Sequence, residues 1–88
     1  MKRGRLEMLI DVLRQVSLHR GCKYTNLMLH ASISYNALYD ITRLLEDKHM
    51  IRIEEEKRRR CVYIEQKGQI WLRTIDELLR LIDFESNS

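Results

Sequence analysis

The stretch SISYNALYDITRLLEDKHMIRI, residues Ser32–Ile53, decides the fold because it joins a helix start, an amphipathic helix and the beginning of a strand. The hydroxyl of Ser34 can accept hydrogen bonds from backbone N–H groups left unpaired in a first helical turn. We therefore expect a helix from Tyr35 to about Lys48. Apolar side chains at helical spacing predict that one face of it is buried: Leu38, Ile41, Leu44 and Leu45.

The opposite face of this helix is polar and is expected to be exposed. It carries Tyr35, Asn36, Tyr39, Asp40 and Arg43. Tyr35, Tyr39 and Arg43 are spaced at i, i+4 and i+8, so they form a row along one side. Such a row can hydrogen-bond to a binding partner, or it can pack beneath a neighbouring element of the same chain.

A β-hairpin is expected after the helix. Met50–Glu55 and Cys61–Glu65 both alternate between apolar and polar residues, and a period of two is typical of half-buried strands. Four consecutive basic residues lie between them, which we place at the hairpin tip: Lys57, Arg58, Arg59 and Arg60. The tip contains neither glycine nor asparagine, so the sequence does not define the turn type.

Two helices are expected before this region. Arg5–His19 is amphipathic, and Gly21 provides a usual helix stop. Lys23–His30 supports a second, shorter helix. Two helices joined by a connection as short as Ala31–Ile33 cannot lie antiparallel over much of their length, so the angled pair of a helix-turn-helix is expected. The residues expected to face inward are Leu6, Leu9, Ile10, Leu13 and Val16 in the first helix and Leu27, Met28 and Leu29 in the second.

The last predicted helix, residues 67–84, has more apolar positions than one stripe requires. One seam consists of Leu72, Ile75, Leu79 and Ile82, and an adjoining one of Trp71, Ile75, Leu78 and Ile82. One seam can cover the domain's own core, and the second needs another chain. We therefore predict a homodimer through these six residues, followed by a frayed polar tail at residues 85–88.

Composition limits the possible functions. The 88 residues suffice for one small folded domain with a marginal core. Residues 1–64 carry 13 basic and 8 acidic side chains, an excess that suits a surface facing a polyanion. No apolar run approaches a membrane span, so we expect a cytoplasmic protein, with no membrane partner.

The sequence offers no pattern typical of an enzyme, a metal site, a cofactor or a small-molecule ligand. It has no Cys–His, Ser–His or paired-carboxylate arrangement and no glycine-rich phosphate loop. Cys22 and Cys61 are the only cysteines, and the histidines are not paired with them. Two buried free thiols are expected, and a disulfide is the alternative in an oxidising compartment.

The order of helix, helix, helix, hairpin and helix predicts a winged helix-turn-helix, an α+β fold that is mostly helical. Residues 1–66 would be the DNA-binding domain and residues 67–84 the dimerisation helix. The third helix would enter the major groove of double-stranded DNA, and the hairpin, or wing, would contact the flanking backbone or the minor groove. The predicted contacts are Ser34, Tyr35, Asn36, Tyr39, Arg43, Lys57, Arg58, Arg59 and Arg60, with Lys2, Arg3, Arg5 and Lys23 as weaker candidates.

Several short stretches also carry a family resemblance. They are Ala31–Tyr39, Leu44-Leu45, Met50-Ile51, Tyr63–Gly68 and Trp71-Leu72. In this pattern the chain resembles, from Arg5 to Ile82, the archaeal winged-helix DNA-binding proteins of the ten-kilodalton chromatin-protein type. The resemblance implies DNA binding as a homodimer joined by an antiparallel pair of C-terminal helices, in a transcriptional regulator or a nucleoid-associated chromatin protein.

Two other functions fit the same features. In a protein–protein assembly module the polar helix face would dock on a partner protein, and the arginines would be incidental. RNA binding is the third possibility. The acidic run Glu54–Glu56 could also face the arginines and leave the hairpin tip as a solvated, non-binding surface.

Overall fold

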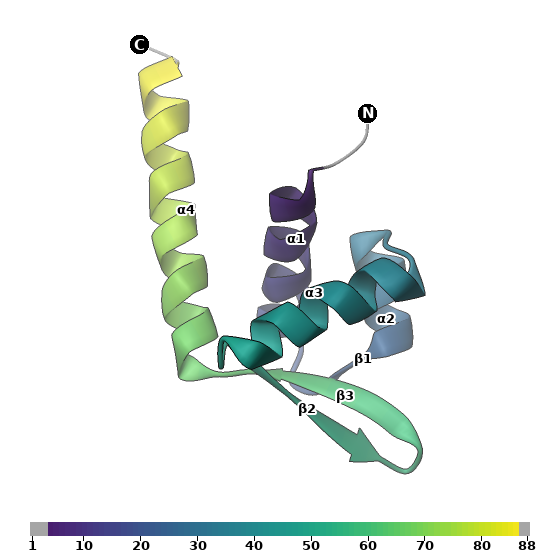
Figure 1. Ribbon diagram of the computed structural model, residues 1–88. Helices are drawn as coiled ribbons and strands as arrows, with labels where there is room; N and C mark the ends of the chain where they lie inside the picture. Colours follow the sequence, from purple (N-terminus) through teal and green to yellow (C-terminus); the bar gives the residue numbers. More distant parts are fainter. Residues whose placement is uncertain (1–3, 87–88) are drawn as a thin grey trace.

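Four helices and three strands make up residues 4–86, the part of the chain that the computed structural model describes (Figure 1). They are α1 (Arg5–Leu18), β1 (Cys22–Lys23), α2 (Tyr24–Ala31), α3 (Tyr35–Asp47), β2 (Ile51–Glu56), β3 (Arg59–Ile64) and α4 (Gln66–Ser86). Their order confirms the predicted winged helix-turn-helix. Side chains are described as far as Asp83.

The helix ends differ slightly from the predicted ones. Helix α3 ends at Asp47 because His49 adopts a left-handed backbone with φ 60°, and the Met50 N–H donates to the Leu45 carbonyl over 2.9 Å. Helix α4 starts at Gln66 and continues to Ser86, so two residues of the predicted frayed tail are helical. The remaining tail residues, 87–88, lie outside the described residues.

Strand β1 was not expected from the sequence. Cys22 and Lys23 pair with Val62 and Cys61 of β3, which gives a three-stranded antiparallel sheet in the order β1-β3-β2. The predicted two-stranded wing is therefore only part of the sheet. Two residues are too short to show an alternating pattern, and their partner strand is distant in the sequence. Gly21, at φ +72°, makes the turn from α1 into this strand.

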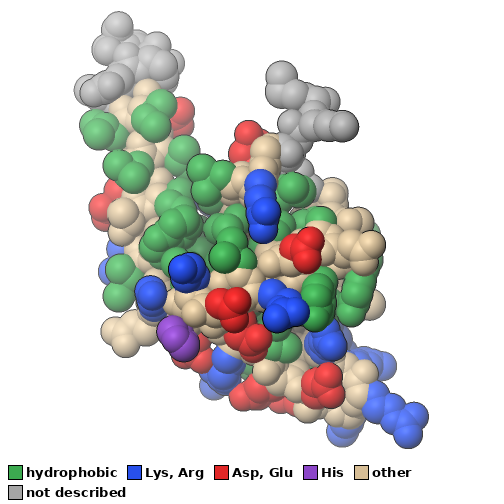
Figure 2. Space-filling model, viewed as in Figure 1, with side chains coloured by type: hydrophobic (Ala, Val, Ile, Leu, Met, Phe, Trp, Pro, Cys, Tyr) green, Lys and Arg blue, Asp and Glu red, His purple; other side chains and the backbone are tan. Residues whose placement is uncertain are grey.

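Helix α4 projects from the head, which we define as residues 4–65 (Figure 1). A Cβ atom on Gly68 would stand 2.3 Å from the Met50 carbonyl oxygen, so only glycine allows this close approach. The guanidinium of Arg14 forms an ion pair of 2.7 Å with Asp76 and ties α4 to α1. Figure 2 shows hydrophobic side chains along the helix farther out. They include Leu78, Leu79, Leu81 and Ile82, each between 43 and 59% exposed.

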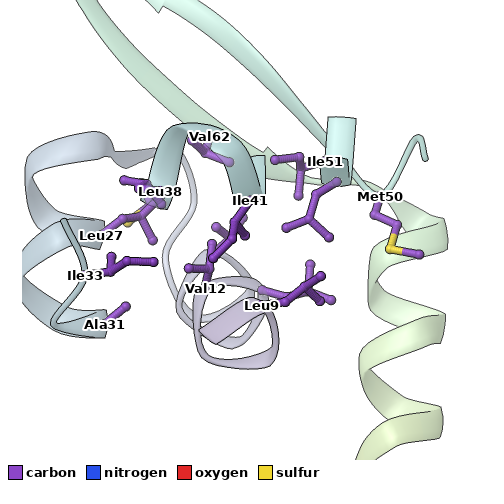
Figure 3. Close-up of a cluster of buried hydrophobic side chains, with 14 of the residues drawn as sticks. Leu9, Val12, Leu27, Ala31, Ile33, Leu38, Ile41, Met50, Ile51 and Val62 are labelled. Atoms are coloured by element: carbon purple, nitrogen blue, oxygen red, sulfur yellow. The ribbon is translucent and has the colours of Figure 1, made fainter. Parts of the chain in front are cut away.

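The hydrophobic core lies between α1, α2, α3 and the sheet (Figure 3). The most deeply buried side chains are Leu13, Leu27, Leu38, Leu45, Ile51, Val12, Val16, Val62 and Thr42. The predictions missed Val12 and Thr42, and they were wrong about Leu6 and Leu29, which are 61 and 74% exposed. Leu6 lies in the first turn of α1, and Leu29 lies on the side of α2 away from Leu27, so periodicity alone misplaced both.

Candidate nucleic-acid interface

The polar face of α3 is exposed, as the spacing predicted. Ser34 caps the helix, since its hydroxyl accepts from the Ala37 N–H over 3.3 Å. The side chains of Ser34, Tyr35, Asn36, Asp40 and Arg43 are exposed, and that of Tyr39 is half-buried. The rings of Tyr35 and Tyr39 are stacked with centres 6.4 Å apart, and the guanidinium of Arg43 lies 5.7 Å from the Tyr39 ring centre. The predicted row therefore exists.

A buried polar contact fixes α3 against α2. The hydroxyl of Thr42 donates to the Leu38 carbonyl over 2.8 Å and also hydrogen-bonds to the hydroxyl of Tyr24. Tyr24 is only 7% exposed, and its ring centre is 5.9 Å from that of Tyr35. The sequence gave no sign of this contact, because a tyrosine and a threonine 18 positions apart show no shared pattern.

The wing ends in a two-residue turn. Lys57 and Arg58 have φ 50° and 66°, so both are in the left-handed region, as a type I′ turn requires. Asparagine and glycine usually occupy these positions, which explains why the sequence did not define the turn. Figure 2 shows basic side chains gathered at the lower right, where Figure 1 places the wing tip.

The four basic wing residues do not form one uniform tip. Lys57 and Arg58 make the turn, whereas Arg59 and Arg60 belong to β3. Arg59 is opposite Glu56 and Arg60 is opposite Glu55 in the ladder. Because successive strand residues point to opposite faces, the two arginines lie on different faces of the wing.

Arg60 is turned toward the helices. Its guanidinium carbon lies 5.8 Å from the ring centre of Tyr24 and 5.9 Å from that of Tyr39, and its Nε is 3.6 Å from Glu55 Oε1. The phenol of Tyr35 contributes most to raising the pKa of Arg60 above its ordinary value. The sequence placed Arg60 at the tip, but the structure places it at the junction of wing and helices.

On the outer face of the wing, the acidic side chains bond to other residues of the wing itself. The guanidinium of Arg52 lies 4.5 Å from the Tyr63 ring centre and donates to Glu54 over 2.9 Å. The hydroxyl of Tyr63 donates to Glu56 over 3.0 Å, which raises the pKa of Tyr63. Within the described side chains, none of Lys57, Arg58 and Arg59 forms an ion pair. The acidic run therefore leaves these three cations available.

A groove joins the wing to the two helices of the helix-turn-helix. It has a volume of about 660 Å³ and is lined by Lys23, Tyr24, Thr25, Asn26, Tyr35, Arg58, Arg59 and Arg60. The predicted residues Tyr35 and Arg58–Arg60 thus share one surface. Thr25 and Asn26 were missed as candidates, although their place at the start of a helix was a usable signal. The weaker candidates Lys2 and Arg3 lie outside the described residues.

The two cysteines are buried free thiols, as expected. Burial is the main cause that raises the pKa of Cys22, and Cys61 adds to it. In the part of the chain that is described, no cluster of three or more His, Cys, Asp or Glu side chains could hold a metal ion.

None of the helices of the described region is both long enough and apolar enough to cross a membrane.

Comparison with solved structures identifies the same fold in other proteins. Sso10a-2, a DNA-binding protein from Sulfolobus solfataricus, is 24% identical with a TM-score of 0.83, over 97% of this chain and 87% of that one. MepR, a transcription regulator of the Staphylococcus aureus multidrug efflux pump MepA, is 14% identical with a TM-score of 0.81, over 89 and 60%. A MarR-family transcriptional regulator from Silicibacter pomeroyi is 19% identical with a TM-score of 0.78, over 84 and 51%.

This chain therefore spans most of Sso10a-2 but only 60 and 51% of the two bacterial regulators. A search among curated proteins found no significant match. The family model described as winged helix-turn-helix matches residues 2–83. By this match, the chain belongs to the winged helix-turn-helix family.

Proposed function

We propose that this protein binds double-stranded DNA as a homodimer and acts in transcription regulation or in chromatin. The observation that carries the proposal is the groove shared by Tyr35 of α3 and the arginines of the wing. An exposed polar helix lies beside Arg58 and Arg59, which form no ion pair within the described side chains. The two features match the two contacts that DNA requires, one with base edges and one with phosphates. The fold shared with Sso10a-2, described as a DNA-binding protein, supports the same function.

In this proposal α3 lies in the major groove. Asn36 is suited to a bidentate pair with adenine, and Arg43 to guanine or a phosphate. Residues near the start of a recognition helix reach base edges most readily, which favours Ser34, Tyr35 and Tyr39 for the neighbouring contacts. Their hydroxyl groups can bond to phosphate, and the tyrosine rings can contact thymine methyl groups.

The wing would contact the flanking backbone or the minor groove. Lys57, Arg58 and Arg59 are exposed and are the cations available for this role. Each phosphate that a cation neutralises releases counterions, so the affinity should fall steeply with salt.

The dimer would form through the outer part of α4. Leu78, Leu79 and Ile82 are exposed to water, where apolar area costs about 25 cal/mol per Å². Trp71 and Ile75 are half-buried and extend the same strip toward the head. Leu72 was also predicted in this seam, but at 8% exposure it packs in the head's own core. The proposed interface therefore consists of the other five residues: Trp71, Ile75, Leu78, Leu79 and Ile82.

The DNA contact can be tested by measuring affinity for duplex DNA across a salt series. Changing Lys57, Arg58 and Arg59 together to alanine should weaken binding and reduce the slope of log affinity against log salt by up to about 3. The matched control changes Lys67, Arg73 and Arg80, three exposed cations of α4, and should leave the slope unchanged. No duplex binding by the wild type at low salt would contradict the proposal and favour a protein assembly module.

The dimer can be tested separately by sedimentation. Leu79→Glu places a charge in the proposed seam and should convert a dimer to a monomer. Leu29→Glu is the control, because Leu29 is 74% exposed on α2 and should leave the mass unchanged. A monomeric wild type, or an unchanged dimer mass for Leu79→Glu, would exclude this interface.

A further inference from the structure

We propose that Arg60 is a positioning residue: it holds the wing against α2 and α3 and does not itself neutralise a DNA phosphate. The inference rests on the proposed DNA-binding function and separates Arg60 from Lys57, Arg58 and Arg59. Arg59 and Arg60 are neighbours in β3 and both line the groove, but among the described side chains only Arg60 has ring contacts and an ion pair.

The free part of the wing has little support from the rest of the sheet. Strand β1 pairs only with Cys61 and Val62 of β3, so residues 55–60 extend beyond it as a two-stranded ribbon. An isolated two-stranded ribbon is at best marginally stable in water. Arg60 lies at the point where this ribbon leaves the three-stranded part. Contacts made there decide the direction in which the ribbon points.

Arg60 makes such contacts with both helices. Its guanidinium lies within 6 Å of the ring centres of Tyr24, on α2, and Tyr39, on α3. This is the range of a cation–π interaction, and a planar guanidinium suits it better than a compact ammonium. Glu55, on the same wing face, is 3.6 Å from Arg60 Nε and keeps the side chain in place.

Both rings have further contacts of their own. The Tyr24 hydroxyl is bonded to Thr42, which is fully buried in α3. The Tyr39 ring is flanked by a second guanidinium, that of Arg43, at 5.7 Å. Arg60 therefore joins the ribbon to a ring that is bonded to the core, that of Tyr24, and its charge is already opposed by Glu55. A phosphate that approached Arg60 would also be repelled by that carboxylate.

Arg59 is the matched comparison. It is exposed, lies opposite Glu56 on the outer face, and forms no ion pair within the described side chains. A substitution there removes one cation but none of the ring contacts or ion pairs among the described side chains. Arg60→Met and Arg59→Met consequently change the net charge equally and differ only in position.

The first experiment measures the affinity of both variants for duplex DNA across a salt series. Arg59→Met should reduce the salt slope by about 0.9, the value for one phosphate contact. Arg60→Met should weaken binding by roughly tenfold at every salt concentration, with less than half of that change in slope, because the remaining cations are misplaced and not removed. Unchanged affinity, or a slope change equal to that of Arg59→Met, would overturn the proposal.

Arg60→Lys separates charge from shape. The ammonium keeps the positive charge but cannot lie flat against two rings, so this variant should bind as weakly as Arg60→Met. Wild-type affinity in Arg60→Lys would show that charge alone matters and would overturn the positioning role. The Arg60 side chain is 40% exposed, so neither substitution removes a core residue, and circular dichroism verifies folding.

A measurement without DNA keeps this inference separate from the proposed function. Amide hydrogen exchange in residues 55–60 should be faster in Arg60→Met than in the wild type or in Arg59→Met. Equal exchange in all three proteins would overturn the positioning role. If the wild type fails to bind duplex DNA, the proposed function fails, while the exchange data still decide whether Arg60 holds the wing.

Discussion

Apolar side chains are buried in the head but exposed on the outer half of α4. In the head, large side chains such as Leu13, Leu27 and Leu38 are less than 2% exposed. In α4 beyond Leu72, Leu78 and Ile82 are 55 and 59% exposed. The core of the head is therefore closed within one chain, whereas the outer half of α4 exposes apolar side chains to solvent. In the proposed dimer these side chains would form the interface between the two chains.

The largest expected effect tests the two regions with the same substitution. Leu38→Ala should lower the free energy of unfolding by about 2–5 kcal/mol, because it leaves a cavity in the closed core of the head. Leu78→Ala should change it by less than about 0.5 kcal/mol at protein concentrations at which sedimentation shows a monomer, because Leu78 is 55% exposed. Urea unfolding at low protein concentration measures both. Similar losses in the two variants would mean that α4 is part of the protomer's core.

The contact that packs the start of α4 on the head is expected to be nearly as sensitive to substitution. Gly68→Ala brings a Cβ to within 2.3 Å of the Met50 carbonyl oxygen and should cost about 1–3 kcal/mol as the backbone shifts. Gly4→Ala is the control, since its nearest neighbour would be a Glu7 carboxylate oxygen at 4.0 Å. Thermal unfolding followed by circular dichroism compares them. Equal melting temperatures for the two variants would show that α4 does not depend on this contact.

Unlike the core of the head, the wing tip has an unfavourable backbone conformation. Lys57 and Arg58 both lie in the left-handed region. Lys57→Asn combined with Arg58→Gly should stabilise the protein by about 1 kcal/mol, since these residues suit a type I′ turn. The same double variant should bind DNA more weakly, with a smaller salt slope, because two cations are lost. A loss of stability would mean that the turn is not strained, and unchanged binding would remove the tip from the interface.

The smallest expected effect concerns the ion pair that links the regions. Arg14 and Asp76 are both partly exposed, and such pairs contribute about 0.2–1 kcal/mol. A double-mutant cycle with Arg14→Ala and Asp76→Ala measures their coupling directly. It should decrease at high salt, where exposed charges are screened. A coupling free energy larger than the destabilisation by Gly68→Ala would mean that the ion pair, and not the glycine contact, contributes most to holding α4 on the head.

The helices and the hairpin could be predicted because their signals are local. Ser34 marked a helix start, and the spacing of Leu38, Ile41 and Leu45 marked its buried face. Strand β1 could not be predicted, since two residues show no period. The need for Gly68 could not be predicted either, because it depends on the Met50 carbonyl, a backbone group far back in the chain.

The candidate site was only partly visible for the same reason. The row of Tyr35, Tyr39 and Arg43 follows from helical spacing alone. The four basic wing residues were visible as a run, but which of them face the helices depends on strand register and on the turn. The role of Tyr24 depends on how α2 packs on α3, which no local pattern encodes.

The tight junction at the start of α4 leaves no flexible linker between β3 and this helix. One residue, Glu65, separates β3 from α4, and its N–H donates to the Met50 carbonyl over 2.9 Å. The rotational phase of the helix is therefore locked to the head. One residue inserted between Gly68 and Leu78 would turn the outer strip by about 100° about the helix axis. In a pair joined through that strip, the two recognition helices would then face different sides of a duplex, although every contact within each protomer remained intact.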